Sequence, residues 1–193
     1  MKKEMLLTSY NTVREQMKPG DLIAFGGMGW LSKIIKFFTM SHVSHVGIVM
    51  DWQEHGRVMV MESTTLNGVK GVQINRLSER IRHYNGHVWW MPLNRVARKR
   101  VSIRALKTFL WTQDGKKYDT KQAIKSAIPF YTRENSDRMF CSELVAGAYK
   151  KSGIATVCNP SEMTPEDVCR LSIFAKTYYQ VKMPNGEVQE ALS

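Results

Sequence analysis

The feature that most constrains this fold is a series of short apolar segments, joined by turn residues, in the first half of the chain. The segments resemble strands in length and composition, and turn-forming pairs such as Asn67-Gly68 separate them. The expected strands are residues 22–25, 45–51, 57–62, 70–74 and 87–91. Because consecutive strands with short connections pair antiparallel, the segments from residue 45 onward predict an antiparallel meander that begins with a hairpin.

Helical spacing of apolar residues dominates the second half of the chain. It predicts helices at residues 103–110 and 139–151, and Thr164-Pro165 followed by two acidic residues is a strong helix start. A last strand is expected at residues 177–182. The fold class is therefore α+β, a central antiparallel sheet packed with helices.

The two ends of the chain are interpreted as additions to this core. An apolar face with spacings of four, three and four residues predicts an N-terminal helix over about residues 3–18. A polar C-terminal tail is expected over about residues 184–193. With 193 residues, no internal repeat and no linker, residues 1–193 are interpreted as a single domain.

Composition excludes several classes of protein. Hydrophobic residues make up 43% of the chain, which is enough for a core, but no apolar run is long enough to span a bilayer and no signal peptide is visible, so a cytoplasmic location is expected. Three cysteines, with spacings that fit no zinc motif, predict neither a disulfide framework nor a metal site, and no cofactor is expected. A net charge of +11 favours anionic partners without choosing among them.

Cys141 is the candidate nucleophile because it lies at or near the start of the expected helix 139–151. A helix N-terminus favours a thiolate over a thiol, and its free N–H groups can hold an oxyanion. The alternative is that Cys141 is a small buried hydrophobic residue; Cys158 and Cys169 keep that interpretation.

His45 and Glu62 are the candidate partners of this thiol. His45 opens a strand beside a loop, where a side chain can face a cleft, and His42 is its competitor. Glu62 ends the next expected strand, so antiparallel pairing brings it to the same sheet edge as His45, where a carboxylate can orient the imidazole. Packing for His45 and solvation for Glu62 are the alternatives.

The segments SHVGIV, MES followed by NGV, and FCSELV together resemble the circularly permuted branch of the NlpC superfamily of papain-like cysteine peptidases and amidases, in particular its YiiX-like group. The likeness extends from about Lys18 to Gly153 and also includes KPGDLIAF and GKKYD. It implies a permuted papain-like fold, with Cys141 as nucleophile, His45 as general base and Glu62 as the residue that orients it. Tyr118, within GKKYD, is carried over as a weaker binding contact, with a half-buried loop tyrosine as the alternative.

The resemblance implies a cysteine-dependent hydrolase or acyltransferase that acts on an amide, ester or thioester through a thioacyl-enzyme. Peptides, peptidoglycan peptides and lipid-linked acyl groups are its possible substrates. Two alternatives stay open, namely a non-catalytic lipid- or peptide-binding member of the fold and a basic nucleic-acid-binding protein. Nucleic acid is disfavoured because no known binding motif is present. The oligomeric state is open.

Two basic segments bear on the partner. Residues 30–40 mix apolar and lysine side chains and are interpreted either as a flap that contacts an acyl chain or an anionic membrane, or as a core helix. Residues 95–104 hold five basic residues in ten. They are interpreted either as a phosphate-binding run or, more simply, as the solvated face of a helix.

Overall fold

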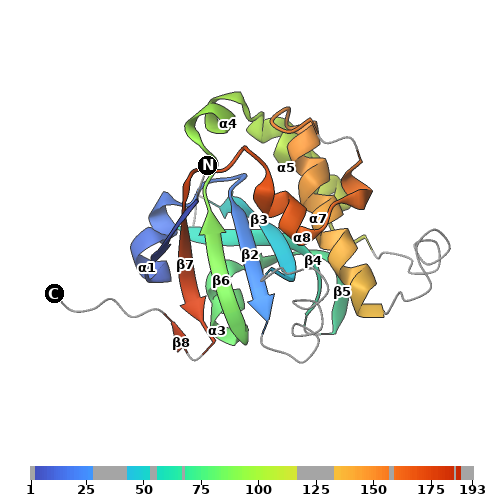
Figure 1. The fold of residues 1–193 in the computed structure, drawn as a ribbon. Helices are drawn as coiled ribbons and strands as arrows, with labels where there is room; N and C mark the ends of the chain where they lie inside the picture. Colours follow the sequence, from blue (N-terminus) through green and yellow to red (C-terminus); the bar gives the residue numbers. More distant parts are fainter. Residues whose placement is uncertain are drawn as a thin grey trace.

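The computed structural model describes residues 3–27, 43–52, 56–66, 68–116, 133–156, 159–184 and 186–187. Within these residues, one eight-stranded sheet has the strand order β1-β7-β6-β2-β3-β4-β5, and β8 pairs with β7 (Figure 1). The strands are β1 (Glu4–Leu7), β2 (Leu22–Gly27), β3 (His45–Trp52), β4 (Arg57–Leu66), β5 (Val69–Arg76), β6 (Gly86–Met91), β7 (Thr177–Met183) and β8 (Gly186–Glu187). The described helices are α1 (Tyr10–Val13), η1 (Arg14–Gln16), α3 (Leu77–His83), α4 (Arg95–Arg100), α5 (Ile103–Gln113), α7 (Arg133–Lys151), η3 (Pro160–Glu162) and α8 (Pro165–Arg170). The predicted α+β class is confirmed, with one parallel pair, β1 with β7, at the edge of an otherwise antiparallel sheet.

The strand order corrects the predicted meander at its last step. β2 to β5 follow one another as neighbours, and the β3–β4 hairpin pairs Ile48 with Met61. The strand expected at 87–91, however, does not lie beside β5. It is β6, and it pairs with the edge of β2 that faces away from β3. The connection contains α3, a helix of seven residues that the sequence analysis missed. A helix between β5 and β6 lets the chain cross the sheet, which a tight turn cannot do.

The N-terminal helix predicted over residues 3–18 is wrong in its first half. Residues 4–7 form β1, whose backbone is tied to β7 through bonds such as Glu4 N–H to Lys176 O, 2.9 Å. Helical structure begins only after Ser9, whose side chain caps α1 by accepting from the amide of Thr12. The apolar spacing was a true signal for Tyr10 and its successors, which are buried, but Leu6 is 43% exposed on the edge strand.

The polar tail predicted over residues 184–193 begins as part of the sheet. Gly186–Glu187 form β8, which pairs with the end of β7 in the register Lys182 to Glu187. The remaining residues of that tail, 188–193, lie outside the described residues. At least two residues of the predicted tail therefore belong to the sheet.

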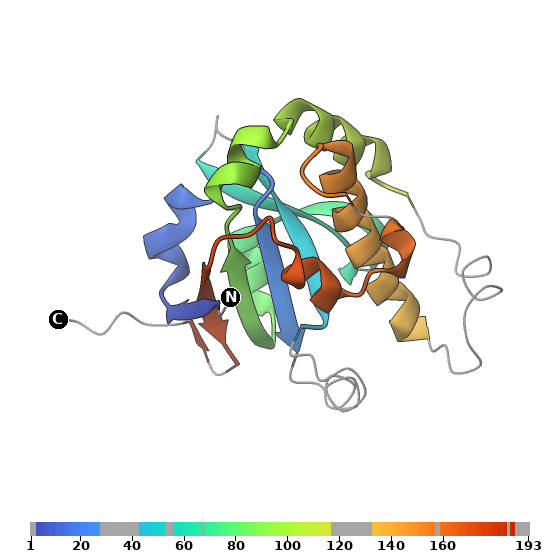
Figure 2. The same cartoon turned by 45° about the horizontal axis from the view of Figure 1, so that its top comes forward.

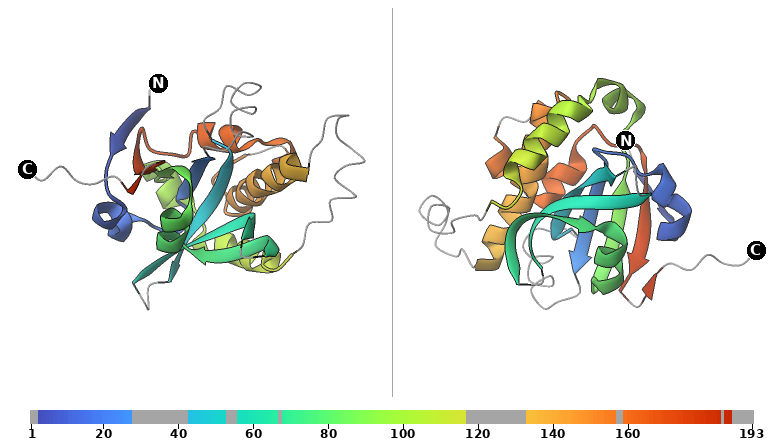
Figure 3. Two further views of the ribbon diagram at one scale, coloured as in Figure 1. Left: turned by 90° about the horizontal axis from the view of Figure 1, so that it is seen from below. Right: turned by 180° about the vertical axis from the view of Figure 1, so that it is seen from behind.

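Two apolar clusters lie on opposite faces of the sheet. Because alternate side chains of a strand point to opposite faces, Leu22 and Ala24 of β2 join one cluster while Ile23 and Phe25 join the other. α5, α7 and α8 cover the first face, and α1 and α3 cover the second (Figure 3).

α5 and α7 pack closely because of one missing side chain. A Cβ atom on Gly147 of α7 would lie 2.9 Å from the ring of Phe109 on α5, so only glycine permits this approach. Figure 2 shows α5 beside α7 near the top of the molecule. The contact fixes α7, the helix that carries Cys141, over β3 and β4.

The basic run 95–104 supplies a partner for a buried carboxylate. Asp21 is 1% exposed and accepts from the indole of Trp90 at 3.0 Å and from the amide of Leu93 at 2.9 Å. Arg98, on α4, reaches the same carboxylate and also donates to Pro19 O at 2.6 Å. At least this arginine is therefore a structural ion-pair partner and not part of a solvated helix face.

Candidate active site

His45 is the first residue of β3 and lies across from Phe25 of β2, with ring centroids 5.3 Å apart. Its side chain is 15% exposed. The Nε2 atom lies 2.7 Å from Oε2 of Glu62, so the predicted contact across the β3–β4 hairpin is present. The strand start thus holds the imidazole at the edge of the core, next to a carboxylate.

Glu62 is fully buried on β4, and four bonds from three side chains satisfy its carboxylate. Besides the imidazole, Nδ2 of Asn75 donates to Oε1 at 3.0 Å. Arg80 donates through Nε to Oε1 at 2.5 Å and through Nη2 to Oε2 at 2.9 Å, a two-point contact that matches the planar guanidinium to the carboxylate. Burial alone would raise the pKa of Glu62, but the hydrogen bonds and positive charges of His45 and Arg80 lower it from 4.5 to about 2. The carboxylate is therefore ionised at neutral pH.

Asn75 and Arg80 were missed in the sequence. Asn75 lies on β5 opposite Val60, two pairs away from Glu62 along the ladder. Arg80 lies on the apolar face of α3 between Leu77 and Ile81, and only 8% of it is exposed. An arginine at a core position of a helix needs an anionic partner, and this was the signal available for it.

Gly47 leaves room for the contact between His45 and Glu62. A Cβ atom there would lie 2.6 Å from Cγ2 of Val60 and 3.2 Å from Cβ of Glu62. Since real Cβ atoms do not approach so closely, a larger residue would push β4 away from β3. The space that Gly47 leaves is therefore filled by β4.

Cys141 lies on α7 and is fully buried. The prediction that it starts the helix is wrong, because α7 begins at Arg133 and Cys141 is in its third turn. The expected helix began at residue 139 because the residues before it are polar in sequence, but polar residues also form helices. Inside a helix each N–H is bonded to the carbonyl four residues earlier, so the expected free N–H groups at Cys141 are taken up by the helix.

The structure nevertheless brings Cys141 to His45. Burial alone would lower the pKa of His45, but the charge of Cys141 and a hydrogen bond with it, together with the bond and charge of Glu62, raise it from 6.5 to about 9. The imidazole therefore lies between a thiol on α7 and a carboxylate on β4. In this setting the protonated imidazolium is favoured near neutral pH, and it stabilises a neighbouring thiolate.

The other candidate residues divide into two groups. Cys169, on α8, is buried, and burial together with the charge of Glu166 raises the pKa of its thiol to about 12, so that it stays protonated. Tyr118, His42, Cys158 and the segment 30–40 lie outside the described residues. Of the two cysteines that the structure describes, only Cys141 contacts an imidazole among the interactions it shows.

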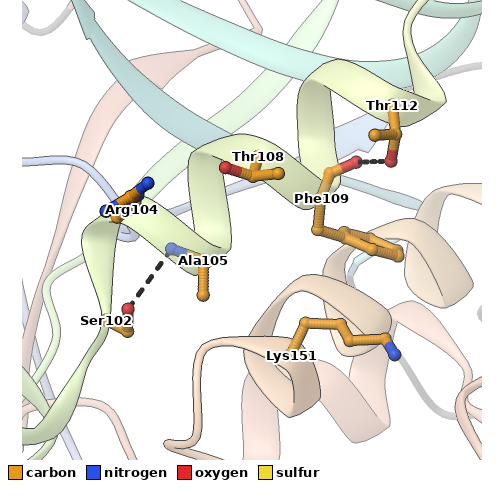
Figure 4. Close-up of a pocket in the computed structure, with 7 residues that line it drawn as sticks. All are labelled: Ser102, Arg104, Ala105, Thr108, Phe109, Thr112 and Lys151. Atoms are coloured by element: carbon orange, nitrogen blue, oxygen red, sulfur yellow. Dashed lines mark hydrogen bonds between the residues drawn. The ribbon is translucent and has the colours of Figure 1, made fainter.

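A hollow of about 440 Å³ lies between α5 and the end of α7 (Figure 4). Its lining residues are Ser102, Arg104, Ala105, Thr108, Phe109, Thr112 and Lys151. Lys151 is ten residues beyond Cys141, about 15 Å along an α-helix, and neither His45 nor Glu62 lines the hollow. It is therefore separate from the cluster of Cys141, His45 and Glu62.

A solved structure has the same architecture. The crystal structure of the metalloprotein yiiX from Escherichia coli O157:H7 superposes with a TM-score of 0.57, at 18% sequence identity, over 87% of this chain and 98% of that one. This likeness establishes that the chain has the same α+β fold as yiiX. No curated protein matches the chain significantly.

The family is established by the sequence itself. The chain belongs to the family described as permuted papain-like amidase enzyme, YaeF/YiiX, C92 family, whose model matches residues 16–168. The resemblance inferred from the motifs is therefore confirmed, and the chain is a member of a family of hydrolases that act on amide bonds. Within the described residues, no helix combines the length and apolar character needed to cross a membrane.

Proposed function

We propose that the chain is a cysteine amidase in which Cys141 is the nucleophile, His45 the general acid and base, and Glu62 the residue that orients the imidazole. The observation that carries the proposal is the position of the His45 ring, 2.7 Å from the buried carboxylate of Glu62 and in hydrogen-bond contact with Cys141. Nucleophile, base and orienting group in such contact form the arrangement that covalent acyl transfer requires.

The proposed reaction has two steps. The Cys141 thiolate attacks the carbonyl carbon of an amide, and the C–N bond breaks as His45 gives its proton to the departing amine. The product of this step is a thioester on Sγ. Water then attacks the thioester while His45 takes a proton, and the carboxylic acid leaves as the thiolate and imidazolium are restored.

We propose a peptide amide, in a free peptide or in peptidoglycan, as the substrate. The amidase family supports an amide bond, and the net charge of +11 favours an anionic polymer through long-range attraction. No step is assigned to a metal ion, although the E. coli neighbour is titled a metalloprotein. The oxygens of Glu62 already accept four bonds, two of them from a guanidinium whose charge repels a cation, and the described residues contain no group of three or more metal-binding side chains.

Thiol alkylation tests the proposal without knowledge of the substrate. Iodoacetamide is added between about pH 5 and 9, and the modified cysteines are mapped by mass. We expect Cys141 to react faster than Cys169 at pH 7, and His45→Ala to slow this reaction by about tenfold or more.

Cys169 is an internal control, because it is slightly more exposed than Cys141, 8% against 0%, but shows no contact with an imidazole among the described residues. Selective reaction of Cys141 therefore reports activation and not exposure. Equal reaction of both thiols near pH 8.5, without a response to His45→Ala, would overturn the proposed function.

A further inference from the structure

The buried cluster of Cys141, His45 and Glu62 contains a fourth charged side chain, Arg80. Arg80 of α3 places a permanent positive charge on Glu62 through two hydrogen bonds. Its guanidinium carbon also lies 5.0 Å from the ring centre of Phe25 and 5.6 Å from that of Tyr84. With aromatic rings against it and 8% exposure, this charge is little screened by water.

The charges of the cluster balance only when Arg80 is counted. Glu62 and a Cys141 thiolate carry two negative charges, and Arg80 and a His45 imidazolium carry two positive ones. Without Arg80, the same set would hold a net negative charge inside the core. A buried uncompensated charge is costly, and the cluster would relieve it by binding protons more tightly.

We propose that Arg80 is a positioning residue that acts through Glu62: its guanidinium compensates the buried carboxylate, so that the thiolate–imidazolium pair of Cys141 and His45 forms at lower pH than it would beside an uncompensated Glu62. The inference rests on the proposed function, which it deepens. Arg80 touches no reacting atom. Its positive charge acts on His45 by offsetting the negative charge of Glu62.

Glu62 does not depend on Arg80 for its position. Its side chain is fixed in the core of β4 and is also held by Asn75 from β5. Removal of the guanidinium therefore changes the charge of the cluster more than its geometry. This separates the proposal from a purely mechanical role, in which Glu62 would swing away from His45.

The other groups around Arg80 do not replace its charge. Its guanidinium lies over the neutral rings of Phe25 on β2 and of Tyr84 just beyond α3. Asn75 of β5, which shares Oε1 of Glu62 with Arg80, is also neutral. On α3 itself, Glu79 lies within 3.6 Å of Arg82 and 3.5 Å of His83, but these side chains are 43–71% exposed. Solvent screens them, so the charge on Glu62 is set by His45 and Arg80.

The test is the pH titration of the His45 imidazole, followed by NMR, in Arg80→Gln and Arg80→Lys, together with the alkylation midpoint of Cys141. We expect Arg80→Gln to raise both midpoints by about one pH unit, because loss of a positive charge at this distance favours every protonated form. Arg80→Lys keeps the charge and is expected to restore both midpoints to within a few tenths of a unit. If Arg80→Gln does not fold, the lysine variant with near-normal midpoints still supports a role of charge.

Arg98→Gln is the matched control. It removes the guanidinium that pairs with the buried carboxylate of Asp21, the residue just before β2. We expect it to lower stability and to leave the His45 midpoint unchanged. If Arg80→Gln leaves the midpoints unchanged or lowers them, the inference fails while the proposed function stands. If wild-type Cys141 shows no selective, His45-dependent reaction, both fail.

Discussion

Glu62 and His45 tie the stability of the protein to pH. The pKa of His45 is raised to about 9, so its contribution is fully present below its ordinary value of 6.5 and is lost as pH rises from 6.5 to about 9. The pKa of Glu62 is lowered to about 2, so its contribution is fully present above 4.5 and is lost as pH falls toward 2. We expect the free energy of unfolding, measured in urea, to be greatest between about pH 4.5 and 6.5.

The variant Glu62→Gln tests how much the buried carboxylate contributes to stability. It keeps the size of the side chain but leaves the guanidinium of Arg80 buried without a carboxylate. We expect a loss of about 3–5 kcal/mol in the free energy of unfolding, measured near pH 6. The decline of stability below pH 4.5 should become shallower in this variant. An unchanged stability would show that the buried pair is not formed in solution.

At the scale of elements, the close contact of β3 with β4 makes Gly47 critical. Gly47→Ala puts a methyl group 2.6 Å from Val60 and 3.2 Å from Cβ of Glu62, so the strands must move apart beside His45. We expect a loss of about 1–3 kcal/mol in the free energy of unfolding and slower alkylation of Cys141 at pH 7. Val49→Ala is the control, because it weakens the same strand without approaching Glu62. Alkylation that slows equally in both variants would contradict the specific role of Gly47.

The sequence predicts most helices and strands because their apolar residues repeat at the spacing that places them in the two apolar core clusters. It fails where tertiary contacts overrule local pattern. Residues 4–7 pair with a strand more than 170 residues away, and the polar first turns of α7 lie outside any apolar stripe. α3 is too short to show a clear period, and its absence from the prediction caused the error in the position of β6.

The candidate site shows the same division. His45 and Glu62 follow from hairpin geometry, since neighbouring strands fix which residues meet. Arg80 does not follow, because its contact with Glu62 depends on where α3 returns to the sheet. Cys141 was selected for a helix start that it does not occupy, and its place beside His45 arises from the packing of α7 on β3 and β4.

At the scale of the whole molecule, we propose that the described residues form one domain. Strands from both ends of the chain, β1 and β7, belong to the sheet that carries His45 and Glu62. Lys182 of β7 links this sheet to α3: it is 6% exposed, and its Nζ donates to Ile81 O at 2.5 Å and to Arg82 O at 3.1 Å. These carbonyls belong to the last turn of the helix that holds Arg80, and a lysine in this position satisfies them.

Lys182→Met tests this link. The substitution keeps the length of the stem but removes the donor to the buried carbonyl of Ile81 and to the partly buried carbonyl of Arg82. We expect a loss of about 1–3 kcal/mol in the free energy of unfolding and slower alkylation of Cys141. Lys176→Met, at an exposed position just before β7, removes the same charge and should change neither quantity. Equal behaviour of the two variants would contradict the link.

The position of Lys182 has a practical consequence for where an expressed fragment of this protein can end. The family match ends at residue 168, yet β7, which supplies this lysine and borders β6, begins at Thr177. A fragment trimmed to the matched region would leave β6 as a bare edge with buried apolar side chains exposed, and such edges aggregate. Expression boundaries chosen from the match alone would therefore yield an insoluble, inactive fragment, and an assay on it would wrongly score the chain as lacking activity.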